Sequence, residues 1–331
     1  MTQRLRQGAP RAAAWLVLTL LLWLALKDIP WGTLEAALDR ARPSWLAASV
    51  LLNLTILPLG AIMWRFLLPQ EPPVKLRTLL WTQALTSTIS TAAPFPSGHL
   101  AGVYILAKRG AVGYETAISL RTLDQVVEAA AKVLLVAVAL ALIPLPRSLQ
   151  LVALGAIAGF LGLATAVGIW AGAARYLHSL ARRRGDRTAR VLRLLAAISA
   201  SLRAERRRGA LAGATAMAVL RKAAEGAAIW CAASALEAQV PTAGILLALA
   251  AVNLATLAPL TPASLGVYEA AAFGAYQLVG VSPATALTLA VVQHAAYLVA
   301  LLGPGWFLPS KLFLKSDPSH SRPPRWSTGA A

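Results

Sequence analysis

The sequence has 331 residues, of which 58% are hydrophobic and 13% charged, and its formal net charge is +18. With a mean hydropathy of +0.64, this composition excludes an ordinary soluble domain and is typical of a polytopic membrane protein. The basic residues lie mostly in loops and tails between apolar runs, which indicates the positive-inside bias of membrane proteins and no nucleic-acid partner. The one cysteine, Cys231, excludes an intramolecular disulfide framework.

Apolar runs close to the roughly 20 residues needed to cross hydrocarbon recur along the chain. We expect an all-α polytopic membrane protein that forms a single integral membrane domain over residues 1–331, with about six full transmembrane helices. These helices are predicted at 12–29, 44–68, 117–146, 149–174, 210–236 and 284–308. The first follows Arg4, Arg6 and Arg11 and has no convincing cleavage site after it, so we interpret it as a retained helix.

The apolar segment 79–107 is long enough to cross a bilayer, but Pro94 and Pro96, followed by Gly98, interrupt it. Proline lacks a backbone donor and clashes with the preceding turn, so a straight helix cannot continue through this point. Irregular backbone at membrane depth is tolerated mainly where it lines a cavity, and the hydroxyl-rich stretch just before the break suits such a lining. We therefore expect a re-entrant hairpin; two short helices joined by a surface turn are the alternative.

A second broken segment, 243–280, is interrupted at Pro259, Pro262 and Gly266. Both breaks are followed by the tripeptide Gly-Val-Tyr. A later match joins Gly113, Ala117 and Leu120 to Gly280, Ala284 and Leu287. A pair of Gly/Pro-interrupted apolar segments at matching positions in two halves indicates the binding site of a transporter.

The segment 175–209 contains eleven arginines against two acidic residues and is expected on the cytoplasmic side. It forms either a topology-setting loop or an amphipathic helix on the inner leaflet. Counting crossings from it places the N- and C-termini in the cytoplasm, in a multi-pass protein of a bacterial-type plasma (inner) membrane. The two broken segments then enter from opposite faces, which predicts an inverted repeat of 44–146 against 210–308. The tail 318–331 is expected to be disordered.

In the helix after the first break, Arg121, Asp124, Glu128 and Lys132 fall on one narrow stripe. Charges inside a span are costly, so they face the bundle interior or water and pair with one another. We expect the pairs Arg121–Asp124 and Glu128–Lys132, with snorkelling of Arg121 to the membrane surface as the structural alternative.

The helix 210–236 carries Arg221, Lys222 and Glu225. Arg221 and Glu225 are four residues apart and share a face, which leaves Lys222 as a candidate for an anionic headgroup. The alternative is an internal ion pair that holds two helices together.

Glu269 lies just past the second break and is a lone carboxylate there, which makes it a candidate functional residue. It could titrate in a proton-coupled cycle, or pair with Arg121 or Arg221. His99, just after the first break, could titrate or bind a phosphate, or be a satisfied histidine at a helix start. A packing role is expected for Gln293-His294.

Soluble-enzyme signatures such as a Walker loop, a dinucleotide fingerprint, a His-x-x-x-His metal pair or a nucleophile elbow do not occur. We therefore expect no catalytic residue, no metal and no cofactor. The candidate substrate-binding residues are Arg121, Asp124, Glu128, Arg221, Lys222, Glu225, Glu269 and His99. Gly155, Gly159 and Gly162 form a small-residue surface suited to helix packing, within the chain or between copies of it.

The chain resembles the lysylphosphatidylglycerol synthase transmembrane-region family, also called flippase-like. The resemblance rests on Pro94–Gly98, on the Arg-x-x-Asp of Arg121 and Asp124, and on Pro262–Glu269 followed by Gly280–Ser282. The sequence departs from the family pattern in one place. Members commonly have Gly-Glu and then an Arg after the first break, whereas here Gly98 is followed by His99 and Gly102 takes the basic position.

In the full-length multiple peptide resistance factors the transferase is a separate soluble domain, which we do not expect in this chain. The resemblance therefore implies the membrane part, associated with moving lipids between leaflets. We expect translocation of an anionic or isoprenoid/glycolipid-type lipid, with membrane lipids as partners. The alternatives are a non-catalytic subunit of a lipid or cell-envelope biosynthesis complex, and an integral-membrane glycosyl or acyl transferase. A lipid-biosynthesis enzyme and a second copy of the chain stay open as further partners.

Overall fold

The computed structural model describes residues 31–68, 73–92, 97–109, 112–182, 208–257 and 261–306, together with residues 192, 195–196 and 199. Within these residues the secondary structure is helical throughout and contains no strand. Some predicted features lie outside the described residues: the helix 12–29, the tail 318–331 and the prolines Pro94, Pro96 and Pro259. Most of the basic segment, residues 175–209, also lies outside them.

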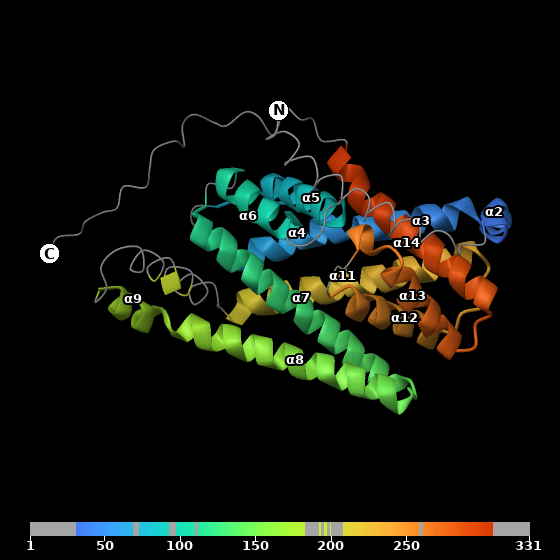
Figure 1. Cartoon of the computed structure of the whole chain (residues 1–331). Helices are drawn as coiled ribbons and strands as arrows, with labels where there is room; N and C mark the ends of the chain where they lie inside the picture. Colours follow the sequence, from blue (N-terminus) through green and yellow to red (C-terminus); the bar gives the residue numbers. More distant parts are fainter. Residues whose placement is uncertain are drawn as a thin grey trace, which may run out of the picture.

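The helices follow one another as a bundle of long and short pieces (Figure 1). The first part of the chain forms α2 (Trp31–Arg40), α3 (Pro43–Leu54), α4 (Ile56–Leu67), α5 (Leu76–Ala92), α6 (Ser97–Arg109) and α7 (Tyr114–Leu142). The middle forms α8 (Arg147–Gly172) and α9 (Ala174–Arg182). The last part forms α11 (Arg208–Ala235), α12 (Thr242–Ala255), the short 3-10 helix η1 (Pro262–Ser264), α13 (Val267–Leu278) and α14 (Pro283–Trp306).

Four helical stretches of the described part are long and apolar enough to cross a membrane, so the chain is a membrane-embedded protein. They are Pro43–Leu67, Tyr114–Leu142, Arg147–Trp170 and Pro283–Gly305, and they correspond to four of the predicted spans. The predicted helix 210–236 is present as α11, with 28 residues. The charged residues Arg221, Lys222 and Glu225 in its middle interrupt the apolar run that a simple span needs. The total of six full spans stays a prediction.

Both predicted breaks separate helices that are too short to span on their own. α5, α6, α12 and α13 have 17, 13, 14 and 12 residues, which at a rise of 1.5 Å gives about 18 to 26 Å against roughly 30 Å of hydrocarbon. After α12 the backbone takes positive φ at Ala263 (55°), Ser264 (56°) and Gly266 (79°). These positive φ values are incompatible with a right-handed α-helix, so α12 does not continue across the second break. Left-handed backbone at Ala or Ser costs about 1–2 kcal/mol per residue.

Glycines bring other helices very close to α5. A Cβ atom on Gly102 of α6 would lie 2.9 Å from the Thr86 hydroxyl, and one on Gly98 would lie 2.6 Å from the Cα of Ser90. On another side, Gly305 of α14 packs against Thr88, whose hydroxyl donates to the Leu301 carbonyl at 3.1 Å. These contacts hold the hydroxyl-rich α5 against α6 and α14. They also leave no room at Gly102 for the basic side chain common at this position in the family that the sequence resembles.

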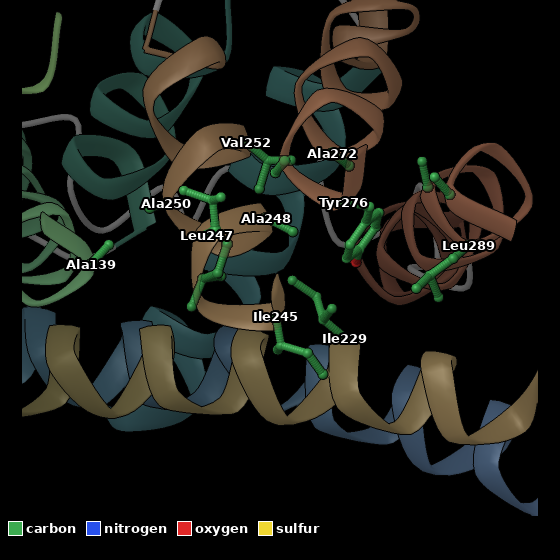
Figure 2. Close-up of a cluster of buried hydrophobic side chains, with 14 of the residues drawn as sticks. Ala139, Ile229, Ile245, Leu247, Ala248, Ala250, Val252, Ala272, Tyr276 and Leu289 are labelled. Carbon is green, nitrogen blue, oxygen red and sulfur yellow. The ribbon is translucent and has the colours of Figure 1, made fainter. Parts of the chain in front are cut away.

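The largest apolar cluster lies where α12, α13 and α14 meet the ends of α7 and α11 (Figure 2). Leu247 and Ala248 of α12, Tyr276 of α13 and Leu289 of α14 are buried together in it. A second cluster joins α4, α5, α6, α7 and α11. The two clusters occupy different parts of the bundle. Charged and polar side chains of α7, α11 and α12 lie on turns of the same helices.

α8 lies along the outside of the bundle beside α7, and most of its side chains are exposed (Figure 1). Cβ atoms placed on Gly155, Gly159 and Gly162 would meet no atom within 4 Å. Within the described part of the chain, these glycines therefore do not mediate the close helix packing predicted for them.

We predict that Gly102→Val destabilises the protein, because the added methyl groups would push α6 away from α5. Overpacking of this kind costs about 1–3 kcal/mol. The measurement is the unfolding transition of detergent-purified protein. Gly155→Val is the matched control, since it makes the same change within a helix but meets open space. Equal losses of stability in the two variants would contradict the packing described here.

Candidate functional site

A cavity of about 310 Å³ lies in the bundle, and many charged and hydroxyl side chains line it. Residues on both sides of each break contribute to it: Ser90 and Thr91 at the end of α5, His99 at the start of α6, Thr256 just after α12, and Thr261, Ala263 and Ser264 before α13. The side chains of Arg121, Asp124, Glu128, Lys132, Arg221, Lys222 and Glu225 also line it. Buried charges are tolerated when they are paired and hydrogen-bonded, and most of these are.

Arg121 and Asp124 form the ion pair that the sequence predicted. They lie one turn apart on α7, and Arg121 Nη1 donates to Asp124 Oδ2 at 2.6 Å. The other carboxylate oxygen accepts a hydrogen bond from Trp64 Nε1 of α4 at 2.9 Å. The Trp64 ring also lies 5.2 Å from the guanidinium carbon, within reach of a cation–π interaction. Arg121 is thus held inside the bundle, and the snorkelling alternative is wrong.

His99 is a hydrogen-bonded histidine at the start of α6. Arg121 Nη2 lies 2.6 Å from His99 Nδ1. Because a guanidinium group has only donors, Nδ1 accepts this hydrogen bond and the imidazole is neutral in this arrangement. The structure therefore agrees with the satisfied histidine and gives His99 no charge with which to attract a phosphate.

Glu128 joins the two halves of the chain. Its carboxylate forms an ion pair with Arg221 of α11, and its second oxygen lies 3.8 Å from Lys222 Nζ. The predicted pair Glu128–Lys132 is wrong, because the Glu128 side chain reaches across to α11 instead of along its own helix. Among the described residues, Lys132 has neither an ion pair nor a hydrogen bond.

The predicted pair of Arg221 with Glu225 is wrong, and so is the expectation that Lys222 is left for an anionic headgroup. Lys222, and not Arg221, binds Glu225, at 2.5 Å. Lys222 also donates to the Asn253 side-chain oxygen of α12 at 3.0 Å, and Asn253 Nδ2 donates to Glu225 at 3.2 Å. Glu225 lies one helical turn from both Arg221 and Lys222. Arg221 faces α7 instead and forms its ion pair with Glu128 there. Lys222 is therefore not the cation left for a ligand.

Glu269 binds neither Arg121 nor Arg221, contrary to that prediction. One of its oxygens accepts the backbone N–H of Gly266 at 2.7 Å, and the other lies 2.7 Å from His294 Nδ1 on α14. Glu269 is in the first turn of α13, where the helix dipole favours a negative charge. A partner within reach on α14 and a local cap together satisfy the carboxylate without an arginine.

Gln293-His294 does more than pack. Both side chains are buried and both line the cavity. The His294 ring stacks on Tyr268 with centroids 4.0 Å apart and an angle of 8° between the planes. The Tyr276 hydroxyl donates to Gln293 Oε1 at 2.5 Å. These contacts fix the orientation of both side chains at the cavity wall.

Several buried polar atoms of cavity-lining residues have no hydrogen-bond partner in the part of the chain that the structure describes. They are Thr86 Oγ1, Gln293 Nε2, His294 Nε2 and the Nε atoms of Arg121 and Arg221. A buried donor or acceptor left unsatisfied costs about 1–3 kcal/mol. Five such atoms belong to residues around one cavity, where bound water or a ligand would offset this cost.

Seven of the eight predicted substrate-binding residues line this cavity, and the eighth, Glu269, binds His294, which also lines it. Their role in binding stays a prediction. The sequence did not indicate Asn253, Gln293 or His294 as parts of the wall. It also did not indicate Trp64, which binds Asp124 from α4 without lining the cavity itself. An asparagine inside the apolar α12 was the one available signal. Within the described residues, no group of three or more His, Cys, Asp or Glu side chains could hold a metal ion.

We predict that Trp64→Phe lowers the free energy of unfolding by about 1–3 kcal/mol, because the buried Asp124 carboxylate loses a donor. Detergent-purified protein unfolded with increasing SDS gives the measurement. Trp81→Phe is the matched control, since Trp81 Nε1 is buried without a partner in the described part of the chain. A loss in Trp81→Phe as large as that in Trp64→Phe would contradict the role of this hydrogen bond.

Neither the curated proteins nor the solved structures include a significant match to this sequence. A family model does match it: the lysylphosphatidylglycerol synthase TM region, over residues 11–305. The matched range includes every helix of the cavity wall except the last residue of α14. Because the match extends over nearly the whole chain, this protein belongs to the family of the lysylphosphatidylglycerol synthase transmembrane region.

Proposed function

We propose that this chain is a flippase-like protein that translocates an anionic or isoprenoid/glycolipid-type lipid across the membrane. The observation that carries the proposal is the cavity itself, in which seven charged side chains and both helix breaks share one wall among apolar helices. Membership of a family of membrane proteins named for a phospholipid synthase supports a lipid-related role. The proposal assigns the chain no catalytic residue, metal or cofactor.

The size and polarity of the cavity suit a lipid headgroup. Ligand pockets usually measure about 300–1,000 Å³, and this one, at about 310 Å³, has room for a headgroup but not for acyl chains. A headgroup that crosses the roughly 30 Å of hydrocarbon must exchange water for other polar partners. Paired charges and unsatisfied polar atoms can supply them while the acyl chains stay in the bilayer.

The order of helix lengths supports an inverted repeat. In the first half a long α3–α4 stretch is followed by the short α5 and α6 and then the long α7; in the second half the long α11 is followed by the short α12 and α13 and then the long α14. α5, which precedes the first break, also packs against η1, which lies between α12 and α13. We propose that the broken segments are re-entrant and enter from opposite faces, as in alternating-access transporters.

The orientation follows from the basic loops. We propose that the basic segment and both termini lie in the cytoplasm and that the membrane is a bacterial-type plasma (inner) membrane. Membrane lipids are then the partners, and a lipid-biosynthesis enzyme would supply or consume them.

We predict that Glu128→Gln slows lipid translocation at least tenfold, because it breaks the ion pair between α7 and α11 in the cavity wall. The measurement uses purified protein in vesicles that contain a fluorescent phosphatidylglycerol, with quenching of the outer leaflet by dithionite. Arg42→Gln is the control, because it breaks the ion pair between Arg42 and Glu237. These two side chains are 60% and 63% exposed, and exposed ion pairs contribute little to stability.

Translocation at the same rate by Glu128→Gln and the unaltered protein, at equal amounts in the vesicles, would contradict the proposed function. Formation of a new product by the purified protein without any partner would favour a membrane transferase instead.

A further inference from the structure

The charges on the cavity wall do not balance. Four cations, Arg121, Lys132, Arg221 and Lys222, face three carboxylates, Asp124, Glu128 and Glu225. Each carboxylate has its own cation, in the pairs Arg121–Asp124, Arg221–Glu128 and Lys222–Glu225. Glu269 is not part of the wall and is held by the Gly266 N–H and by His294. One positive charge, that of Lys132, is left over.

Lys132 is placed to meet a ligand. It lies one turn beyond Glu128 on α7, in the middle of a helix long enough to cross the membrane, and its side chain lines the cavity. No carboxylate of the described residues lies within ion-pair distance of its ammonium group. A charge at such a position is costly unless something pairs with it. An anion in the cavity would restore the balance.

Apart from the Nε atoms of Arg121 and Arg221, whose guanidinium groups are already paired with carboxylates, the open atoms of the wall are a hydroxyl oxygen, an amide nitrogen and an imidazole nitrogen. Thr86 Oγ1, Gln293 Nε2 and His294 Nε2 have no partner among the described residues, and their side chains belong to residues that are only 4%, 2% and 1% exposed. The Tyr276 hydroxyl occupies the oxygen of the Gln293 amide, which leaves the amide nitrogen as a donor. Groups of this kind recognise hydroxyls, which both donate and accept hydrogen bonds.

We infer that the cavity selects a phosphodiester with one negative charge that carries a hydroxylated head, such as glycerol or a sugar, and rejects the same phosphodiester when its head carries an added amine. Lys132 binds the phosphate, and Thr86, Gln293 and His294 bind the head hydroxyls. An added ammonium group would meet a wall that already has a cation in excess, where like charges repel strongly because the dielectric is low. The inference rests on the proposed function for the identity of the site and names its substrate class.

Equilibrium binding to the detergent-purified full chain tests this inference, with native mass spectrometry as the readout. The probes are phosphatidylglycerol, phosphatidylglycerol esterified with lysine, phosphatidylpropanol, which keeps the charge but lacks the head hydroxyls, and a neutral glucosyl diacylglycerol. Water-soluble glycerophosphoglycerol is added as a competitor, which separates recognition of the headgroup from binding of the acyl chains. We expect phosphatidylglycerol to bind at least tenfold more tightly than each of the other three lipids, and glycerophosphoglycerol to displace it.

Lys132→Gln should weaken phosphatidylglycerol binding about 10- to 100-fold, as expected for a charge-assisted hydrogen bond, and Lys132→Arg should retain most of it. Gln293→Leu should remove the preference for phosphatidylglycerol over phosphatidylpropanol. Lys108→Gln is the matched control, because Lys108 is exposed near the end of α6 and does not line the cavity; it should bind phosphatidylglycerol unchanged.

Equal or tighter binding of the lysine ester, unchanged binding in Lys132→Gln, no displacement by glycerophosphoglycerol, or no binding of any probe would each overturn the inference. Binding is measured without transport, so the two proposals can fail separately. Selective, Lys132-dependent binding by a protein that does not translocate phosphatidylglycerol in vesicles would contradict the proposed function alone.

Discussion

The ion pair between Glu128 and Arg221 joins two helices whose residues lie 93 positions apart in the sequence. Neither charge can be buried among apolar helices alone, and removing one partner of such a buried pair typically costs about 3–5 kcal/mol. The pair therefore holds α7 against α11 and keeps the charged turn of α11 inside the bundle. Lys222, Glu225 and Asn253 extend the same polar contact to α12. The need to pair these buried charges therefore brings polar groups of α7, α11 and α12 together.

Hydroxyl side chains beside both helix breaks line the same cavity as the paired charges. Short helices end and begin there, and glycines on α6 and α14 let these helices approach α5 closely. The cavity is what remains between these close contacts and the paired charges. Its wall combines groups that already have partners, and so keep their geometry, with a few atoms that do not. Such a wall resembles a binding site more than an apolar core, in which unsatisfied polar atoms are rare.

Patterns within one helix predicted the local features of the site. Arg121 and Asp124 are three residues apart, so their pairing follows from helix geometry alone. The Pro/Gly interruptions located both breaks, and the apolar runs located the long helices. The motifs that resemble the flippase-like family also led to the family that the chain belongs to.

Pairings between helices could not be predicted in this way. Glu128 and Arg221 each have an oppositely charged residue four positions away on the same helix. In the structure they pair with each other instead, and the sequence does not show that α7 and α11 lie side by side. The same applies to Glu269, whose partner His294 lies on α14, and to Trp64, which caps Asp124 from α4. Once these partners are known, the spare cation is Lys132 and not Lys222. Local spacing thus predicted which residues are polar and buried, but not which one is left for a ligand.

The central claim is that water and a lipid headgroup reach a charged cavity inside the membrane. Its most direct test is labelling of Ser87→Cys, a position on the cavity wall, in a chain whose buried Cys231 is replaced by serine. A membrane-impermeant thiol reagent should label this cysteine, and added phosphatidylglycerol should slow the labelling. If only a lipid-soluble reagent labels it, as expected for Leu163→Cys on the exposed side of α8, the cavity is not open to water and the claim is contradicted.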